Sequence, residues 1–256
     1  MSLDGKRVVM TGGAGGIGQL VAGELLSAGA DLTVIDRADE LPYDATTYFK
    51  GDLSTPDGLA EIRSILRASD WDILINMAGM LYFGPFEDQT PSHIQTNYMV
   101  NLVAPVLLAQ SVVPAMRRRG SGQIVNIGSV FGSINFAHFV TYSSTKAGLK
   151  GFSEALRREV HGTGIDVTYI APRAVKTPLN TSHVLQFAEV TGMKLDEPGA
   201  VAHRIVQAIA GRKKDVYIGF PESLFVRLNA LLPRFVDAAL VKNDRQASAI
   251  FAASMN

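Results

Sequence analysis

A phenol and an ammonium group stand four residues apart in Tyr142-Ser-Ser-Thr-Lys146. Side chains at this spacing on a helix lie on one face, so the two groups can share one site. A phenol with a pKa of about 10 is a poor base at neutral pH, and a neighbouring ammonium lowers that pKa by favouring the phenolate. The pair is therefore suited to moving a proton to or from an oxygen atom. The same spacing is common by chance, and surface decoration is its ordinary explanation.

A glycine-rich segment near the N-terminus is the second chemical feature. Residues 11–18 read Thr-Gly-Gly-Ala-Gly-Gly-Ile-Gly, after a β-branched run and before a helical pattern. Glycines in that setting allow a tight turn, bring backbone N–H groups to a pyrophosphate and let the helix pack closely on the strand. A purely structural turn is the alternative. Since no Lys-Ser or Lys-Thr follows, the segment is not a P-loop for nucleoside triphosphates.

The second predicted strand ends at Asp36. A carboxylate there can accept both hydroxyl groups of an adenosine ribose, whereas a 2′-phosphate would meet its negative charge. Residue 13 is glycine, which supplies no compensating charge, although Arg37 could accommodate a phosphate. We therefore expect NAD in preference to NADP. The alternative for Asp36 is a surface acid that caps the next turn.

Other motifs complete a pattern. Asn76-Met77-Ala78-Gly79 follows one predicted strand, Ser129 follows another, and Asn101 lies in a long helical stretch. With the glycine loop and the Tyr142–Lys146 pair, the chain from residue 7 to about 180 resembles the short-chain dehydrogenase/reductase family. Gly12, Gly16 and Gly18 match its shorter members, while Gly12, Gly15 and Gly18 match the longer sugar-nucleotide epimerases. Chain length and the Asn-x-Ala-Gly motif favour the shorter branch.

The resemblance implies an oxidoreductase that interconverts a secondary alcohol and a ketone by hydride transfer to or from NAD(H). It implies that Tyr142 moves the proton, Ser129 holds the substrate oxygen, Lys146 also grips the nicotinamide ribose, and Asn101 holds a relay water. The cofactor-binding residues that it implies are Gly12, Gly16, Ile17, Gly18, Asp36, Arg37, Asp52, Leu53, Asn76, Ala78, Gly79, Tyr142, Lys146, Pro172, Val175 and Thr177. A catalytically silent nucleotide-binding regulator of the same fold is the alternative.

One position departs from the family pattern. After the sixth strand the family usually has Pro-Gly and then a Thr, whereas this chain has Pro172-Arg173-Ala174-Val175-Lys176-Thr177. Two explanations are open for Arg173. It points to solvent, or it contacts an anion on the cofactor or substrate.

The elements that position these residues alternate between strand and helix. The β-branched runs predict seven strands, at Arg7–Met10, Leu32–Asp36, Thr47–Lys50, Ile73–Asn76, Gln123–Ile127, Asp166–Ile170 and Asp215–Ile218. Helical patterns lie between them, two of them opened by Thr55-Pro56 and Thr90-Pro91. This alternation predicts an α/β Rossmann fold, a doubly wound parallel sheet of about seven strands with helices on both faces. We expect one domain over residues 1–256.

Composition narrows the classes further. The chain has 24 basic and 24 acidic residues, so no net charge attracts it to nucleic acid. It has no cysteine, which fits a cytoplasmic location, and its five histidines have no metal-binding spacing. The N-terminus lacks the pattern of a signal peptide. The apolar run Tyr98–Met116 is interrupted by polar residues and prolines and is interpreted as a buried or subunit-facing helix.

Two later segments concern the substrate. Apolar residues in the segments that the resemblance assigns to substrate, including the loop 177–200, predict a lipophilic alcohol or ketone unless they fill the core. They are Tyr82, Phe83, Phe86, Val130, Phe131, Ile134, Phe136, Phe139, Leu179, Val184, Leu185, Phe187 and Met193. The stripe in residues 221–242 is typical of core or a subunit contact, with membrane association possible but not favoured. By resemblance we expect a homodimer or homotetramer, through helices at Asn97–Arg118 and Thr141–His161.

Overall fold

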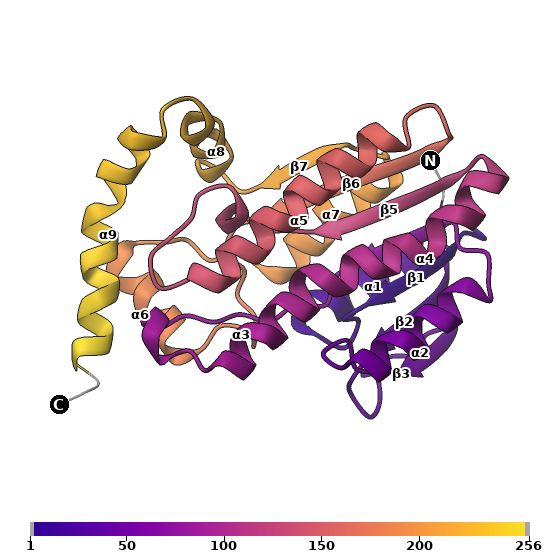
Figure 1. Ribbon diagram of the computed structural model, residues 1–256, viewed down its shortest axis with the longest axis horizontal. Helices are drawn as coiled ribbons and strands as arrows, with labels where there is room; N and C mark the ends of the chain where they lie inside the picture. The colour runs from indigo at the N-terminus through magenta and orange to yellow at the C-terminus, as the bar shows by residue number, and fades with distance from the viewer. Residues whose placement is uncertain (1–2, 254–256) are drawn as a thin grey trace.

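Seven parallel strands form one twisted sheet, in the order β3-β2-β1-β4-β5-β6-β7 (Figure 1). The computed structural model describes residues 3–253. The strands are β1 (Arg7–Thr11), β2 (Asp31–Asp36), β3 (Thr47–Lys50), β4 (Ile73–Asn76), β5 (Gly122–Ile127), β6 (Ile165–Pro172) and β7 (Asp215–Ile218). All seven predicted strands are present, and the predicted fold class is confirmed.

Helices cover both faces of this sheet. The elements are α1 (Gly16–Ser27), α2 (Pro56–Arg67), α3 (Pro91–Tyr98), α4 (Ala104–Arg119), α5 (Val140–Glu159), α6 (Ser182–Thr191), α7 (Pro198–Ala210), α8 (Glu222–Leu231) and α9 (Pro233–Ala253), with short helical turns η1 (Phe86–Asp88), η2 (Met99–Val103) and η3 (Val130–Gly132). Since side chains alternate between the faces of a strand, Val8 packs in the core beneath α1 and α7, while Val9 packs in the core beneath α2 and α4. The central strands are therefore apolar on both faces.

The helix ends carry the expected caps. The Thr55 hydroxyl accepts a hydrogen bond from the Gly58 N–H at the start of α2, and Thr90 accepts one from His93 at the start of α3. Gly120 ends α4 in the left-handed conformation, with φ +66°. These local signals fix where the helices begin and end beside the sheet.

Helices α3 and α4 form one continuous run of 29 residues, Pro91–Arg119, joined by the single π-helical turn η2. The mean hydropathy of its most apolar 18-residue window is 1.7, so the run is long and apolar enough to cross a membrane by length and composition. Half of its most apolar window is buried inside the protein, as for the core helix of a globular domain. Leu108, Val112 and Met116 pack into the sheet core, which agrees with the interpretation as a buried helix.

Helices α8 and α9 extend from the end of the sheet where β7 finishes, and α9 stands along one side of the molecule (Figure 1). Pro233 restarts the helix, as expected. The expected burial holds for only part of the stripe: Val226 and Val236 pack against Val130 and Ile134. The outward side is largely exposed and consists of Leu224, Phe225, Leu231, Leu232 and Phe235.

Candidate active site

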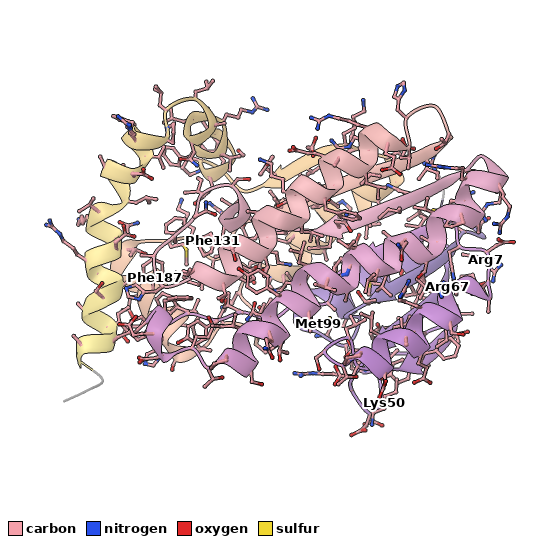
Figure 2. All side chains as sticks on the ribbon, viewed as in Figure 1. Arg7, Lys50, Arg67, Met99, Phe131 and Phe187 are labelled. Carbon is pink, nitrogen blue, oxygen red and sulfur yellow. The ribbon has the colours of Figure 1, made fainter. Side chains whose placement is uncertain are left out.

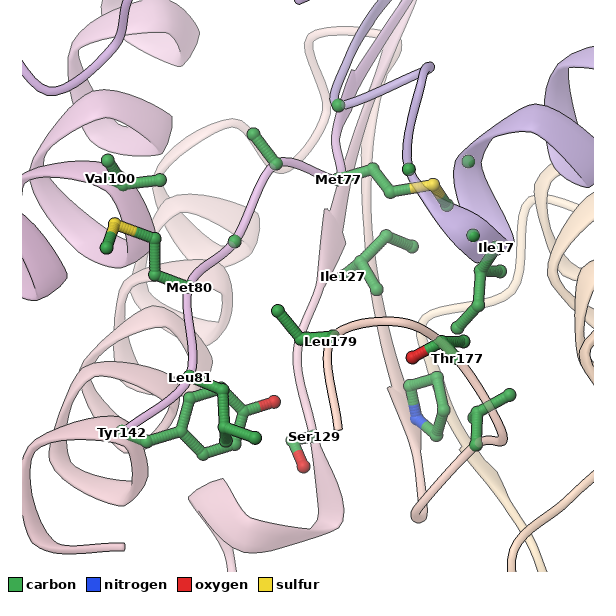
Figure 3. Close-up of a pocket in the computed structure, with 18 of the residues that line it drawn as sticks. Ile17, Met77, Met80, Leu81, Val100, Ile127, Ser129, Tyr142, Thr177 and Leu179 are labelled. Carbon is green, nitrogen blue, oxygen red and sulfur yellow. The ribbon is translucent and has the colours of Figure 1, made fainter. Parts of the chain in front are cut away.

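A cavity of about 480 Å³ opens at the carboxyl ends of the strands, where ligands bind in open α/β sheets (Figure 3). It is lined by the segments that follow β1, β2, β3, β4, β5 and β6, so residues from most of the chain meet there. One end contains the glycine loop and the other the Ser129–Tyr142 pair.

The glycine loop between β1 and α1 is shaped for a close ligand. Gly12 has φ +78°, and a side chain there would lie 2.6 Å from the Ala78 backbone. A side chain at Gly18 would overlap the carbonyl oxygen of Gly12. In the described part of the chain no side chain caps the first turn of α1, so its N–H groups face the cavity with their partial positive charge. These features fit a dinucleotide pyrophosphate.

The adenosine end is arranged around Asp36. Its carboxylate accepts hydrogen bonds from the N–H of Ala14 at 2.9 Å and of Ala38 at 3.2 Å, which fix it at the rim of the cavity. Tyr43 lies behind the loop and donates a hydrogen bond to the Gly13 carbonyl at 2.9 Å. Burial and the negative charge of Asp36 raise the pKa of Tyr43 to about 12, so the phenol remains a donor. Arg37, Asp52 and Leu53 also line this end.

At the opposite end three side chains converge on the cavity. Ser129 follows β5, and Tyr142 and Lys146 come from the first turns of α5. Figure 3 shows the hydroxyl groups of Tyr142 and Ser129 projecting into the cavity beside Leu81 and Leu179. The Ser129 hydroxyl also accepts a hydrogen bond from the Phe131 N–H at 3.1 Å. The Lys146 ammonium donates to the Ile127 carbonyl at 3.0 Å and lies 5.8 Å from the centre of the Tyr142 ring.

The electrostatics of this end differ from the expectation. Burial raises the pKa of the Tyr142 phenol, and this outweighs the opposite effect of the neighbouring Ser129 hydroxyl. Burial also lowers the pKa of Lys146 to about 8. The predicted lowering of the tyrosine pKa by the ammonium is therefore wrong for the protein without nucleotide, because loss of water solvation dominates at this depth.

Two predicted site residues do not line the cavity. Asn101 is fully buried in η2, and its side-chain amide bonds the Met80 backbone at both N–H and C=O, each at 2.8 Å. Asn76 is buried at the end of β4 and donates to Asn126 on β5 at 2.8 Å. Asn101 therefore holds the segment 77–80 from behind, whereas Asn76 joins β4 to β5. All other residues of the predicted catalytic and cofactor sets line the cavity.

The substrate end is apolar, but with fewer residues than expected. Phe131, Phe139, Leu179, Val184 and Met193 line it, joined by Leu81. The remaining predicted residues serve elsewhere. Phe83 and Phe187 form a buried aromatic cluster with Phe139, and Val130 and Ile134 pack beneath α8. Tyr82 packs edge-on against His93, Phe136 packs against Phe131, and Phe86 and Leu185 are exposed. Figure 2 places Phe131 and Phe187 at the end of the molecule nearest α9.

Arg173 fits neither explanation left open by the sequence. Its guanidinium neither points to solvent nor stands free for an anion, because Asp196 and Glu222 hold it in two ion pairs. Tyr43 and Leu81 were missed altogether. Leu81 could have been found, since it follows Gly79 within the segment after β4. Tyr43 lies in a connection with no motif, so the sequence contains no signal for it.

Comparisons with known proteins agree with this geometry. The family model described as short chain dehydrogenase matches residues 6–186. Dehydrogenase/reductase SDR family member 7B of Bos taurus is 32% identical, over 88% of this chain and 77% of that protein. Ketoacyl reductase HetN of Nostoc sp. is 29% identical, over 85% and 79%. A short-chain dehydrogenase from Sphingobium yanoikuyae in complex with NADPH superposes with a TM-score of 0.76 at 27% identity, covering 92% of this chain and 95% of that one.

Proposed function

This chain belongs to the short-chain dehydrogenase family and is an oxidoreductase that acts on CH–OH groups, and we propose that it interconverts a lipophilic secondary alcohol and its ketone with NAD(H). The observation that carries the proposal is the convergence of Ser129, Tyr142 and Lys146 at one end of a cavity whose other end is a glycine loop. A protein that only binds a nucleotide needs the glycine loop but not these three side chains.

The proton chemistry follows from these side chains. Ser129 is placed to donate a hydrogen bond to the substrate oxygen and hold it against the Tyr142 phenol. Because burial keeps that phenol protonated, Tyr142 is ready to donate its proton to the oxygen of a ketone. A bound nicotinamide supplies or accepts the hydride. In the oxidation direction the same phenol must first lose its proton, which the positive charge of Lys146 favours once the site is filled.

The NAD preference rests on the fixed position of Asp36. The two backbone N–H groups hold its carboxylate where an adenosine ribose would bind, and a 2′-phosphate there would meet like charge. Tyr43 also fills the space beside Gly13, where a basic side chain would otherwise reach that phosphate. The alternative is NADP(H), favoured by Arg37 at the same rim and by the NADPH bound to the relative from Sphingobium yanoikuyae.

The substrate class rests on the cavity lining. The wall opposite Tyr142 is made of leucine, valine, methionine and phenylalanine side chains, which offer no hydrogen bonds to a sugar or polyol. A ketone with an aliphatic, aromatic or steroid-like body would bury apolar surface there.

The test combines binding with turnover. NADH and NADPH are titrated by fluorescence, and aliphatic, aromatic and steroid-like ketones and alcohols are screened at the nicotinamide absorbance band. We expect tighter NADH binding and turnover that Tyr142→Phe abolishes while nucleotide binding remains. Turnover that survives in Tyr142→Phe would refute the proton-transfer role. Nucleotide binding with no turnover across the panel would favour the silent regulator.

We also propose that the protein forms a homo-oligomer through α4 and α5. Apolar surface is exposed beside these helices, at the end of α3 (Tyr98), in η2 (Val103) and at the first residue of α5 (Val140). Sedimentation equilibrium measures the state, and a monomer across the micromolar range would contradict the proposal.

A further inference from the structure

Arg173 is the cavity residue whose interactions the proposed reaction does not use. It follows the last residue of β6, and its side chain is only 12% exposed. Its Nε and Nη2 donate to the two carboxylate oxygens of Asp196 at 2.9 and 2.5 Å. Its Nη1 donates to the Glu222 carboxylate at 2.8 Å and to the Phe220 carbonyl at 2.9 Å. Four of the five guanidinium N–H groups are therefore used, with two carboxylates around one cation.

The first partner, Asp196, closes the base of the substrate loop. Its N–H donates to the Ala174 carbonyl at 2.9 Å, and its carbonyl accepts from the Lys176 N–H at 3.0 Å. Residues 173–176 and 196 are thus joined through both backbone and side chains. Between them run the residues that carry α6 and the apolar wall of the cavity, Leu179, Val184 and Met193.

The second partner begins the C-terminal helices. Glu222 is the first residue of α8, and Phe220 stands two residues before it. Gly219, at the end of β7, lies against the stem of Arg173, where a side chain would come within 2.5 Å of the arginine Cδ. The connection from β7 to α8 is therefore built around the guanidinium.

Helices α6 and α9 also contact each other directly, away from Arg173. Gln246 of α9 donates to the Val190 carbonyl of α6 at 2.8 Å. Phe187 of α6 packs in one buried cluster with Ala247 and Ile250 of α9 and with Phe139 beside the catalytic tyrosine. Helices α6 and α9 are thus connected to each other by packing, and both are connected to the cofactor-facing segment through Arg173.

We propose that Arg173 is a positioning residue that fixes α6, with α9 packed behind it, as one wall of the substrate site, at a set distance from Ser129 and Tyr142. This rests on the proposed function only for its kinetic consequence. Without the guanidinium, Asp196 and Glu222 are left as two neighbouring carboxylates that repel each other. This repulsion would separate the base of the substrate loop from the start of α8. Lysine cannot restore the arrangement, because its point charge cannot bind two carboxylates and a carbonyl in a planar fork.

The first test needs no substrate. Hydrogen exchange is followed by mass spectrometry in the NADH-saturated wild type, Arg173→Ala, Arg173→Lys and Arg157→Ala. Arg157 is the matched control, since it also binds both oxygens of one carboxylate, Asp215, and two carbonyls, but lies outside the cavity. We expect faster exchange in α6, α8 and α9 together in both Arg173 variants and not in Arg157→Ala. Unchanged exchange in these helices, or a change in α8 alone, would overturn the proposal.

The second test uses the best ketone from the panel. We expect kcat/KM to fall by roughly 10- to 100-fold in Arg173→Ala, mostly through KM, because small displacements of a binding wall have effects of this size. The dissociation constant of NADH should change little, and Glu222→Gln should give a smaller effect in the same direction. Equal losses in Arg173→Ala and Arg157→Ala, or full rescue by Arg173→Lys, would show a merely structural ion pair. If no ketone turns over, the proposed function fails. The hydrogen-exchange result still shows whether Arg173 positions these helices.

Discussion

Lys146 illustrates how burial and catalysis conflict at a single side chain. The site needs its positive charge, yet Lys146 is only 5% exposed, and its ammonium donates a hydrogen bond to the Ile127 carbonyl. Loss of water solvation disfavours the charged form and lowers its pKa to about 8. Near neutral pH the folded protein therefore carries a charge that it holds less favourably than the unfolded chain does.

This conflict predicts an unusual pH dependence of stability. Between pH 8 and 10 the unfolded chain keeps the lysine proton and the folded protein releases it, so the free energy of unfolding should rise with pH. Relative to Lys146→Met, the wild type should gain about 1–2 kcal/mol between pH 7.5 and 9.5. Urea unfolding at several pH values measures the difference. Parallel curves for the two proteins would mean that the folded pKa is ordinary.

Asp36 makes a second prediction at the scale of one residue. Replacing it with serine removes the charge that opposes a 2′-phosphate and keeps a short polar side chain. NADPH affinity should rise by roughly tenfold or more, since juxtaposed like charges cost several kcal/mol. The matched control is Asp39→Asn, which removes an exposed acid paired with Lys50 that lies outside the cavity. Fluorescence titration measures the dissociation constants of NADH and NADPH in both variants. An equal gain in NADPH affinity in the two variants would point to a general charge effect.

At the scale of elements, the strands were predictable and the cover over the site was not. The runs in β1, β4 and β5 are apolar on both faces, and only a central parallel strand uses such a pattern. The stripe in α8 gave no indication of which side would be covered. Arg173 finds its acidic partners in segments distant in the chain, and pairing at that range leaves no periodic signal in the sequence.

The catalytic pair could be predicted from the sequence because its two residues are close in the chain. Tyr142 and Lys146 are one helical turn apart, so helix geometry alone places them together. Asn101 was assigned a place in the site but holds the Met80 backbone from behind, because η2 turns its amide toward that segment. The sequence identified the residue, and tertiary packing determined what it contacts.

The junction of β1 and α1 predicts a sharp contrast between two glycines of one helix. Gly18→Ala should lose NADH binding and stability, because the added carbon overlaps the Gly12 carbonyl and forces the helix away from the loop. Gly23→Ala should stabilise the protein by about 0.5–1 kcal/mol, because it lies in open space on the same helix. Thermal unfolding and NADH titration of both variants provide the check. Normal NADH binding in Gly18→Ala would refute the close-packing argument.

At the scale of the whole molecule, the cavity joins six strand ends, and so nucleotide binding should report on the entire sheet. At 100 times its dissociation constant, NADH should add about 2.7 kcal/mol to the free energy of unfolding. For a chain of this size that corresponds to a rise in melting temperature of roughly 5–10 °C. NADPH at the same concentration should give a smaller rise. An equal rise with both nucleotides would remove the preference for NAD.

β1 lies between β2 and β4 in the sheet, although α1, β2, β3 and α2 separate it from β4 in the chain. During synthesis at about 5–20 residues per second, one edge of β1 stays unpaired for several seconds until residues 73–76 emerge. The nucleotide gives no help in that interval, because Lys146 and residues 172–177 are made later still. The nascent chain must therefore protect an apolar strand edge without its ligand. We expect this protein to be most prone to aggregation while it is still emerging from the ribosome.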